Sequence, residues 1–365
     1  MNRRLSLPAN GQRGLSLIEL MVGLTVGLVI SLGLFALVAG TSSAFKVQDD
    51  FARLQENGTS ALRYLVDDIR MAGFYGLATD SQSVHLDSAT LAAAGIGGIT
   101  DDCAAGTPSP PWSLNLLQPI DVESGLTPAS VHAALPCIQA NDFAASNASV
   151  IILRGATGTA VPATDLDANT LYVQSSPTQD PNTILFRGNK FADLKADGHT
   201  RSFTNGDDFP IFEYQTHVYY LRPCSRPTPP ATTCSNLLND DGGRSIPTLV
   251  RHELVGSTLQ LVPLVEGIER INLLYGIDSN NDGVIEQFTA TPADWSQVVA
   301  VRVFVLVRTT TATTGYSDAN KSYDLGGGVT FACTPNVDCN FRRHVFSQIA
   351  SVRNCAQRRG GDKPC

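Results

Sequence analysis

The segment Arg13-Gly14-Leu15-Ser16-Leu17-Ile18-Glu19-Leu20 opens an apolar run that continues to Gly40. From Leu20 to Gly40 there is no charged residue. As a helix this run would rise about 30 Å, the thickness of the hydrocarbon core of a bilayer. The charged residues ahead of Gly14 are all basic: Arg3, Arg4 and Arg13. Because basic residues stay on the cytoplasmic side, the sequence predicts a helix that enters the membrane from the cytoplasm and leaves the rest of the chain outside.

Three ordinary interpretations compete for this segment. A secretory signal peptide has an apolar core of about 7–15 residues and a small-residue cleavage site, whereas this run is longer and Ser42-Ser43-Ala44 comes late. A buried core helix is disfavoured because no face of the run is polar. A plain transmembrane anchor fits the length but does not account for Glu19. An ionisable side chain is costly there, so Glu19 is a candidate functional residue.

The string Gly14-Leu15-Ser16-Leu17-Ile18-Glu19-Leu20 resembles the class III signal of type IV pilins and type II secretion pseudopilins. The resemblance implies that a prepilin peptidase cuts between Gly14 and Leu15 and methylates the new amine. The apolar helix then stays in the mature protein, with Glu19 as its fifth residue. Leu15 departs from the Phe that is most common at the first mature position.

The predicted role of Glu19 follows from the charge that cleavage creates. The new amine of Leu15 would lie at the start of a helix surrounded by lipid or by other apolar helices, where an unpaired charge is expensive. Glu19 lies one turn further along the same face, and a helix N-terminus favours a carboxylate. Glu19 can therefore neutralise its own amine or that of an adjacent subunit, which matches the docking role that the resemblance implies. The alternative is an anionic residue merely tolerated at the membrane edge.

Composition is that of an exported protein. The chain has 365 residues and a formal net charge of −8, and loss of a leader with three arginines would make the charge −11. It has no basic stripe, so direct nucleic-acid binding is disfavoured. The eight cysteines all lie beyond residue 100, without a Cys-x-x-Cys pair, and the six histidines are scattered. This pattern favours disulfides in an oxidising compartment such as the periplasm over a zinc site.

Beyond Gly40 the helix is expected to continue with one apolar stripe and to end near Gly73 and Gly76, about 80 Å from its start at 1.5 Å per residue. Strand patterns follow in the rest of the chain: 150–153, 171–173, 184–186, 209–221, 248–254, 259–262, 268–275, 298–307 and 341–352. The run 298–307 is apolar on both faces, which predicts a central strand. The predicted fold class is α+β, a pilin-like long N-terminal helix packed on a mainly antiparallel sheet.

We expect five segments: a leader (1–14), a transmembrane or pilus-core helix (15–40), the amphipathic half of the helix (41–76), a variable connection with little regular structure (77–147) and a β-rich periplasmic domain (148–365). Neighbouring cysteines are the simplest disulfide pairs, although eight cysteines allow about 105 connectivities. The expected pairs are Cys103–Cys137, Cys224–Cys234, Cys333–Cys339 and Cys355–Cys365.

Two strings in the last third of the chain sharpen the family resemblance. Leu264 to Glu269, followed by Leu273 to Asp278, is similar to the PilW family of minor pilins, and so is Arg342 to Asn354. This resemblance implies a low-abundance subunit that primes pilus assembly at the tip. The implied partners are other minor pilins, the major pilin, a PilY-type tip adhesin and the prepilin peptidase, with the inner membrane as anchor.

The segment Asp278-Ser279-Asn280-Asn281-Asp282-Gly283-Val284-Ile285-Glu286 is the other candidate site. Oxygen-bearing side chains at alternate positions, here Asp278, Asn280 and Asp282, resemble the start of a calcium loop, with Glu286 at its ninth position. Thr289 stands at the twelfth position, where a full loop needs a bidentate Glu. The alternative is an Asp-Gly hairpin turn. No other cofactor is expected.

We found no nucleophile elbow, phosphate-binding glycine loop or paired histidine ligands, so an enzyme is not predicted. The preferred interpretation is a minor pilin. The alternatives are a minor pseudopilin of a type II secretion system and a membrane-anchored adhesin that never polymerises.

Overall fold

The computed structural model describes residues 14, 16–77, 94–96, 99, 103–104, 111–144, 148–176, 183–235, 239–280, 282–335 and 337–352. The chain forms two compact units, Met1–Ala52 and Arg53–Cys365. Helix α1 (Leu17–Met71, 55 residues) supplies the described helix of the first unit and the first element of the second. The predicted divisions after residues 14, 40, 76 and 147 stay predictions.

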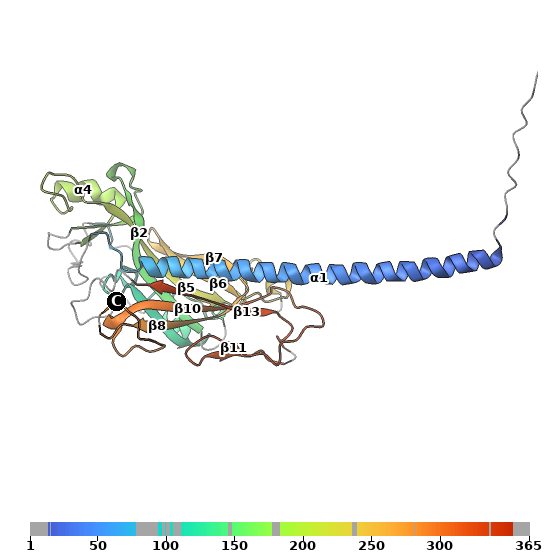
Figure 1. The fold of residues 1–365 in the computed structure, drawn as a ribbon. Helices are drawn as coiled ribbons and strands as arrows, with labels where there is room; N and C mark the ends of the chain where they lie inside the picture. Colours follow the sequence, from blue (N-terminus) through green and yellow to red (C-terminus); the bar gives the residue numbers. More distant parts are fainter. Residues whose placement is uncertain are drawn as a thin grey trace, which may run out of the picture. The chain divides into compact units, whose positions relative to one another are not determined.

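Helix α1 ends where the sequence predicts. Gly73 and Gly76 have φ values of 73° and 79°, in the left-handed region that glycine tolerates best. The N–H of Gly73 donates to the carbonyl of Arg154, 2.9 Å away, so the end of the helix is tied to the backbone of a strand that lies much later in the chain. Figure 1 draws α1 in blue, with its C-terminal turns beside β5 and β6.

The first sheet has seven strands among the described residues, in the order β1-β2-β5-β3-β4, and β6 and β7 extend it from β5. All its pairings are antiparallel. Strand β5 is long enough to pair with β3 near its start and with β6 near its end. The strands are β1 (Ile120–Leu126), β2 (Ala148–Val161), β3 (Leu171–Ser175), β4 (Thr183–Arg187), β5 (Ile211–Arg222), β6 (Thr248–Val255) and β7 (Thr258–Glu266).

The second sheet has the order β13-β10-β8-β9 within the described chain and is also antiparallel. Its strands are β8 (Ile268–Ile277), β9 (Gln287–Thr289), β10 (Val298–Arg308) and β13 (Arg343–Ser351). Strand β10 pairs on both sides, which confirms the predicted central strand. A short pair, β11 (Tyr323–Asp324) and β12 (Thr330–Phe331), lies in the connection before β13.

The remaining elements among the described residues are short. Two of these are α-helical turns, α3 (Val131–Ala134) and α4 (Phe191–Ala196). The rest are 3₁₀ turns: η1 (Trp112–Leu114), η2 (Ala140–Asp142), η3 (Ala163–Asp165), η4 (Gly188–Lys190), η5 (Asp240–Gly242) and η6 (Trp295–Gln297).

The main core lies between the second half of α1 and both sheets. Leu54, Leu65 and Ile69 of α1 are almost fully buried against residues such as Tyr219 of β5 and Val303 of β10. At about 25 cal/mol per Å² of apolar surface, burying side chains of this size stabilises the fold by roughly 1.5–3 kcal/mol each. The α+β class, with a long N-terminal helix on antiparallel sheets, is therefore confirmed.

The prediction of little regular structure between residues 77 and 147 is wrong for residues 111–144. Strand β1 pairs with β2, and Ile120 and Leu126 join buried clusters. The sequence Ile120-Asp121-Val122-Glu123 alternates apolar and polar residues, and β1, at the end of the strand order, buries only part of its surface. Its register with β2, rather than its own composition, makes it a strand.

Candidate functional site

The start of α1 is closed by a reciprocal pair of hydrogen bonds. The backbone N–H of Ser16 donates to Oε2 of Glu19 over 2.9 Å, and Ser16 Oγ accepts from the N–H of Ile18 over 3.2 Å. This is the capping box, in which a Ser and a Glu three residues later satisfy backbone donors that have no partner in the helix. Glu19 therefore holds a carboxylate at the positive end of the α1 dipole. The predicted cleavage and methylation residue Leu15 lies outside the described residues.

Gly14 and the apolar turns behind Glu19 are exposed, and no other described part of the chain covers them. The segment Leu17–Val38 meets the length and hydropathy of a membrane span, and none of it is buried. A Cβ atom added at Gly14 would meet no atom within 4 Å, and the same is true at Gly23, Gly27 and Gly33. The fold itself thus gives no reason for a glycine at position 14.

The second half of α1 is held on the first sheet by Asp68. Its Oδ2 lies 2.5 Å from Nδ1 of His217, accepts a hydrogen bond from the hydroxyl of Tyr219, and lies 3.9 Å from Nη1 of Arg251. Burial raises the pKa of Asp68, but the hydrogen bond and charge of His217, aided by Tyr219 and Arg251, outweigh burial and bring the pKa below its ordinary value. Asp68 therefore anchors the helix to β5 and β6 as a carboxylate.

The second sheet approaches α1 most closely at Gly58. A Cβ atom at this position would lie only 2.3 Å from a ring carbon of Phe346 on β13. Beside it, Nδ2 of Asn57 donates to the carbonyl of Glu266 over 2.9 Å. The Asn-Gly pair weakens a helix by sequence, and here it allows β13 to lie against the helix backbone.

The two strings that resemble PilW meet at Arg343. The side chain of Arg343 is fully buried, and its Nε donates to Oε2 of Glu269 over 2.6 Å. The same guanidinium reaches Asp318 at 2.9 Å and Asp338 at 3.0 Å. Burial lowers the pKa of Arg343, but hydrogen bonds and charges of Glu269 and Asp318 outweigh it and raise the pKa. Arg343 thus joins β8 and β13 to the connection that precedes β13.

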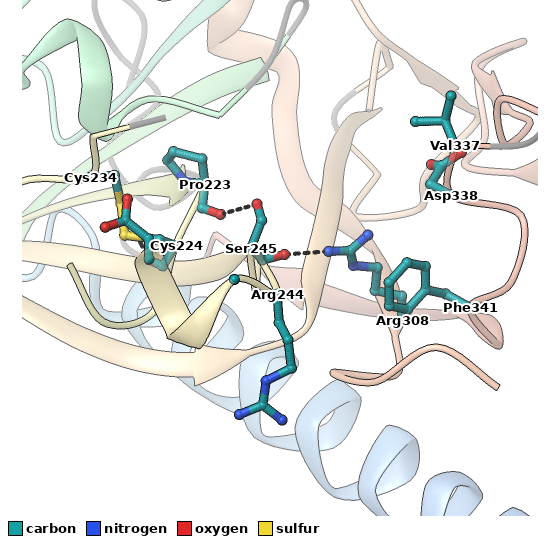
Figure 2. Close-up of a pocket in the computed structure, with 11 residues that line it drawn as sticks. Pro223, Cys224, Cys234, Arg244, Ser245, Arg308, Val337, Asp338 and Phe341 are labelled. Atoms are coloured by element: carbon teal, nitrogen blue, oxygen red, sulfur yellow. Dashed lines mark hydrogen bonds between the residues drawn. A yellow bond between two sulfur atoms is a disulfide. The ribbon is translucent and has the colours of Figure 1, made fainter. Parts of the chain in front are cut away.

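Disulfides link cysteines in three of the four predicted pairs: Cys103–Cys137, Cys224–Cys234 and Cys333–Cys339. The fourth predicted pair, Cys355–Cys365, lies outside the described residues. The Cys224–Cys234 disulfide borders a pocket of about 480 Å³ that Arg244, Arg308 and Phe341 also line. Figure 2 shows this pocket, with Ser245 bonded both to Pro223 and to Arg308.

The acidic segment 278–286 connects the antiparallel strands β8 and β9. Because β9 begins at Gln287, this connection is longer than the predicted Asp-Gly hairpin turn. Asp278 is buried, and its carboxylate accepts the N–H groups of Asp282 (3.2 Å) and Gly283 (3.0 Å). Glu286 accepts the N–H of Ser279 over 2.8 Å. Carboxylate oxygens of Asp278, Asp282 and Glu286 lie within 4.8 Å of one another, and calcium binding stays a prediction.

The sequence analysis did not single out several of these residues as site residues. Ser16 had a signal, because Ser-x-x-Glu before an apolar run is a known capping pattern. Asp68 had none, since its partner His217 lies 149 residues away. Arg343 stood inside a string that resembles PilW, but its three carboxylate partners come from separate parts of the chain.

Comparison with known proteins gives two family matches. Residues 237–354 match the family described as type IV pilus-assembly protein W, PilW, and residues 9–35 match the prokaryotic N-terminal methylation motif. A search of curated proteins finds no match. Among solved structures, a type IV-like pilin from Thermus thermophilus is 14% identical, with 39% of this chain and 80% of that chain covered and a TM-score of 0.21. The match to the N-terminal methylation motif contains the capping box at the start of α1, and the match to the PilW family contains the Arg343 cluster, so both ends of the chain are similar to type IV pilus assembly proteins.

Proposed function

We propose that this protein is a minor pilin that joins other minor pilins, the major pilin and a PilY-type adhesin to prime pilus assembly at the tip. In the proposed cycle a prepilin peptidase removes residues 1–14 and methylates the amine of Leu15. Before assembly the apolar helix anchors the protein in the inner membrane, with its N-terminus cytoplasmic and its large domain periplasmic.

One observation carries this proposal: α1 joins an apolar, fully exposed half to a half that is packed in a domain. A membrane helix needed only as an anchor has no use for a carboxylate in its first turn, where burial in lipid is costly. A subunit that moves from lipid into a bundle of neighbouring helices has a use for it, because Glu19 can pair with an amine. We therefore propose a structural role for the exposed half and for the packed half of α1, and we propose no enzymatic reaction.

The test is a clean deletion, complemented by the full chain, with surface pili and secreted enzymes measured in the same strain. We expect loss of pili with secretion intact, restored by the wild-type gene. Loss of secretion with pili intact would support a type II pseudopilin instead. A mature protein that keeps residues 1–14, together with normal piliation, would support a non-polymerising adhesin.

A further inference from the structure

We propose that the pocket lined by Arg226 and Arg244, between the described residues 224–235 and 239–246, is a docking site for an acidic polypeptide segment on a neighbouring pilus subunit. This inference rests on the proposed function, because it assumes that the chain contacts other subunits. It adds a site in the large domain, away from the apolar helix.

The described residues around the two arginines are cross-linked to one another within the chain. The Cys224–Cys234 disulfide joins two of them, and the carboxylate of Asp241 accepts the backbone N–H groups of Arg226 (2.6 Å) and Ile246 (2.7 Å). Asp240 likewise accepts the N–H of Ser235 over 2.8 Å, which holds the pKa of Asp240 below its ordinary value. A preformed loop loses little conformational entropy on binding, so more of its contact energy appears as affinity.

Because Asp240 and Asp241 accept these backbone hydrogen bonds, their carboxylates do not pair with the guanidinium groups of Arg226 and Arg244. Both aspartates of the loop are occupied by backbone donors, and Arg244 reaches only the carbonyl oxygen of Asp241, through Nε at 3.3 Å. Within the described part of the chain, neither Arg226 nor Arg244 forms an ion pair, and both are exposed. An arginine fork matches a carboxylate with two parallel hydrogen bonds, so these residues are suited to an acidic ligand.

Both arginines line one pocket of about 560 Å³, together with Pro227, Ile246 and Glu266. Glu266 accepts the hydroxyl of Ser225 over 2.6 Å, so an acceptor stands beside the two donors. A polypeptide can present carboxylates to the arginines and N–H groups to Glu266, whereas a phosphate dianion has no donor to offer Glu266. The mixture of donors, an acceptor and rigid apolar walls therefore favours a peptide segment.

The neighbouring arginine, Arg308, is not proposed to bind the acidic segment, because its guanidinium already has partners within the chain. Its Nη2 donates to the carbonyl of Ser245 over 2.5 Å, its Nη1 lies 3.7 Å from Glu269, and its guanidinium lies 4.1 Å from the ring centre of Phe341. Figure 2 shows Arg244 directed away from Arg308. Val337 is 73% exposed and lines the pocket on the Arg308 side together with Arg244. Exposed arginine beside exposed apolar surface is typical of protein interfaces.

The experiment is photocrosslinking in living cells with the full chain. A p-benzoylphenylalanine residue is placed at Thr310, on the pocket wall, and at Val284, an exposed residue on the acidic turn, as the control. We expect an adduct from position 310 to a pilus subunit, with the crosslinked peptide mapped by mass spectrometry to an Asp- or Glu-rich segment. Position 284 should not give that adduct.

Charge variants then test the arginines. The double variant Arg226→Glu/Arg244→Glu should lower the yield of the adduct on the order of tenfold. Reversing the mapped acidic residues on the partner should restore it. Arg226→Lys/Arg244→Lys, which keeps the charge but loses the fork, should fall between the two. Lys190→Glu, at an exposed lysine outside the loop, is the matched control and should leave the adduct unchanged. Mapping of the Cys224–Cys234 disulfide in each variant verifies that the loop has formed.

A phospholipid adduct, the absence of a subunit adduct at position 310, or a subunit adduct that survives both Glu substitutions would overturn the proposal. The deletion strain separates this failure from failure of the proposed function. If deletion abolishes pili but the double Glu variant assembles them and crosslinks as the wild type does, the docking site is wrong and the minor-pilin role stands.

Discussion

The first 22 residues of α1 and its last turns belong to one helix but differ in what surrounds them. Leu17–Val38 is apolar on every side and has no buried residue, whereas Leu65 and Ile69 are buried between two sheets. The space around the glycines differs in the same way between the two regions. A Cβ at Gly23 or Gly33 would meet open space, while a Cβ at Gly58 would overlap the ring of Phe346. The first half is thus open to partners outside the chain, and the second half is already fitted to partners within it.

Replacement of Gly14 by Trp should have the largest effect of any single change in the first half. No atom lies near a Cβ at Gly14, so the fold should tolerate the substitution, but the proposed peptidase site should be blocked completely. N-terminal sequencing and intact mass of the membrane-extracted protein measure the outcome. The wild type should start at Leu15, and the variant should keep residues 1–14. Gly33→Ala is the control that should be processed normally. A wild-type start after Ala44 would contradict the class III signal.

Glu19→Ala should also act through partners and not through the domain. We expect the variant to be cleaved and inserted but to co-purify poorly with other pilus subunits, because the amine of Leu15 then has no carboxylate to pair with. Loss of one capping interaction costs the helix only about 0.5–2 kcal/mol. Crosslinking and pull-down from sheared pili measure incorporation. Wild-type piliation and normal co-purification would show that Glu19 does not pair with an amine in this subunit.

Asp68→Asn tests the second half, through stability. Loss of the charged hydrogen bonds to His217 and Tyr219 should destabilise the large domain by about 1.5–3 kcal/mol at neutral pH. Both tryptophans, Trp112 and Trp295, lie in that domain, so the urea midpoint of tryptophan fluorescence reports it. Processing at Gly14 should be unchanged.

The pH dependence of this difference has a definite sign. Folding lowers the pKa of Asp68 from its ordinary value of 3.8, so the carboxylate stabilises the folded state fully above that value. As the pH falls through the lowered pKa, the proton binds and the stabilisation is lost. The gap between wild type and Asp68→Asn should therefore persist at neutral pH and shrink below pH 3.8. A gap that is unchanged at low pH would mean that the charge of Asp68 is not the cause.

Gly58→Ala should change the free energy of unfolding less, because the gain in helix propensity opposes the cost of overpacking. Alanine favours a helix by about 1 kcal/mol, whereas overpacking against Phe346 costs about 1–3 kcal/mol. We expect a net loss of about 1 kcal/mol in the urea midpoint assay. The double variant Gly58→Ala/Phe346→Ala should lose less than the sum of the two single variants, because the clash is gone. Additive losses would indicate that β13 does not press on the helix at Gly58.

Calcium should have the smallest effect. The carboxylate of Asp278 already accepts two backbone N–H groups, so the turn is complete by itself. We expect about 1 mM calcium, in the range of weak extracellular sites, to leave the urea midpoint unchanged. A calcium-dependent shift that Asp282→Asn and Glu286→Gln each remove would establish the calcium loop instead.

The sequence alone determined the features that depend on neighbours along the chain. The apolar run after Gly14 predicted the exposed helix, because the absence of any polar face needs no tertiary context. The alternation in residues 209–221 and the apolar run 298–307 predicted β5 and β10, since strand pattern and burial follow from successive residues. Gly73 and Gly76 predicted the end of α1, because glycine adopts the left-handed conformation most easily.

Only the tertiary structure decided which distant residues meet. Strand β1 carries polar residues at 121, 123 and 124 and becomes a strand by pairing with β2, a choice of register that its own residues do not specify. The partners of Asp68 and Arg343, and the open space around Arg226 and Arg244, depend on how loops of separate origin pack together. Such contacts arise from chain segments that lie far apart in sequence, and a local pattern carries no information about which segment will arrive. The exposed apolar helix could therefore be predicted from sequence, whereas the domain surface that we propose as a docking site required the fold.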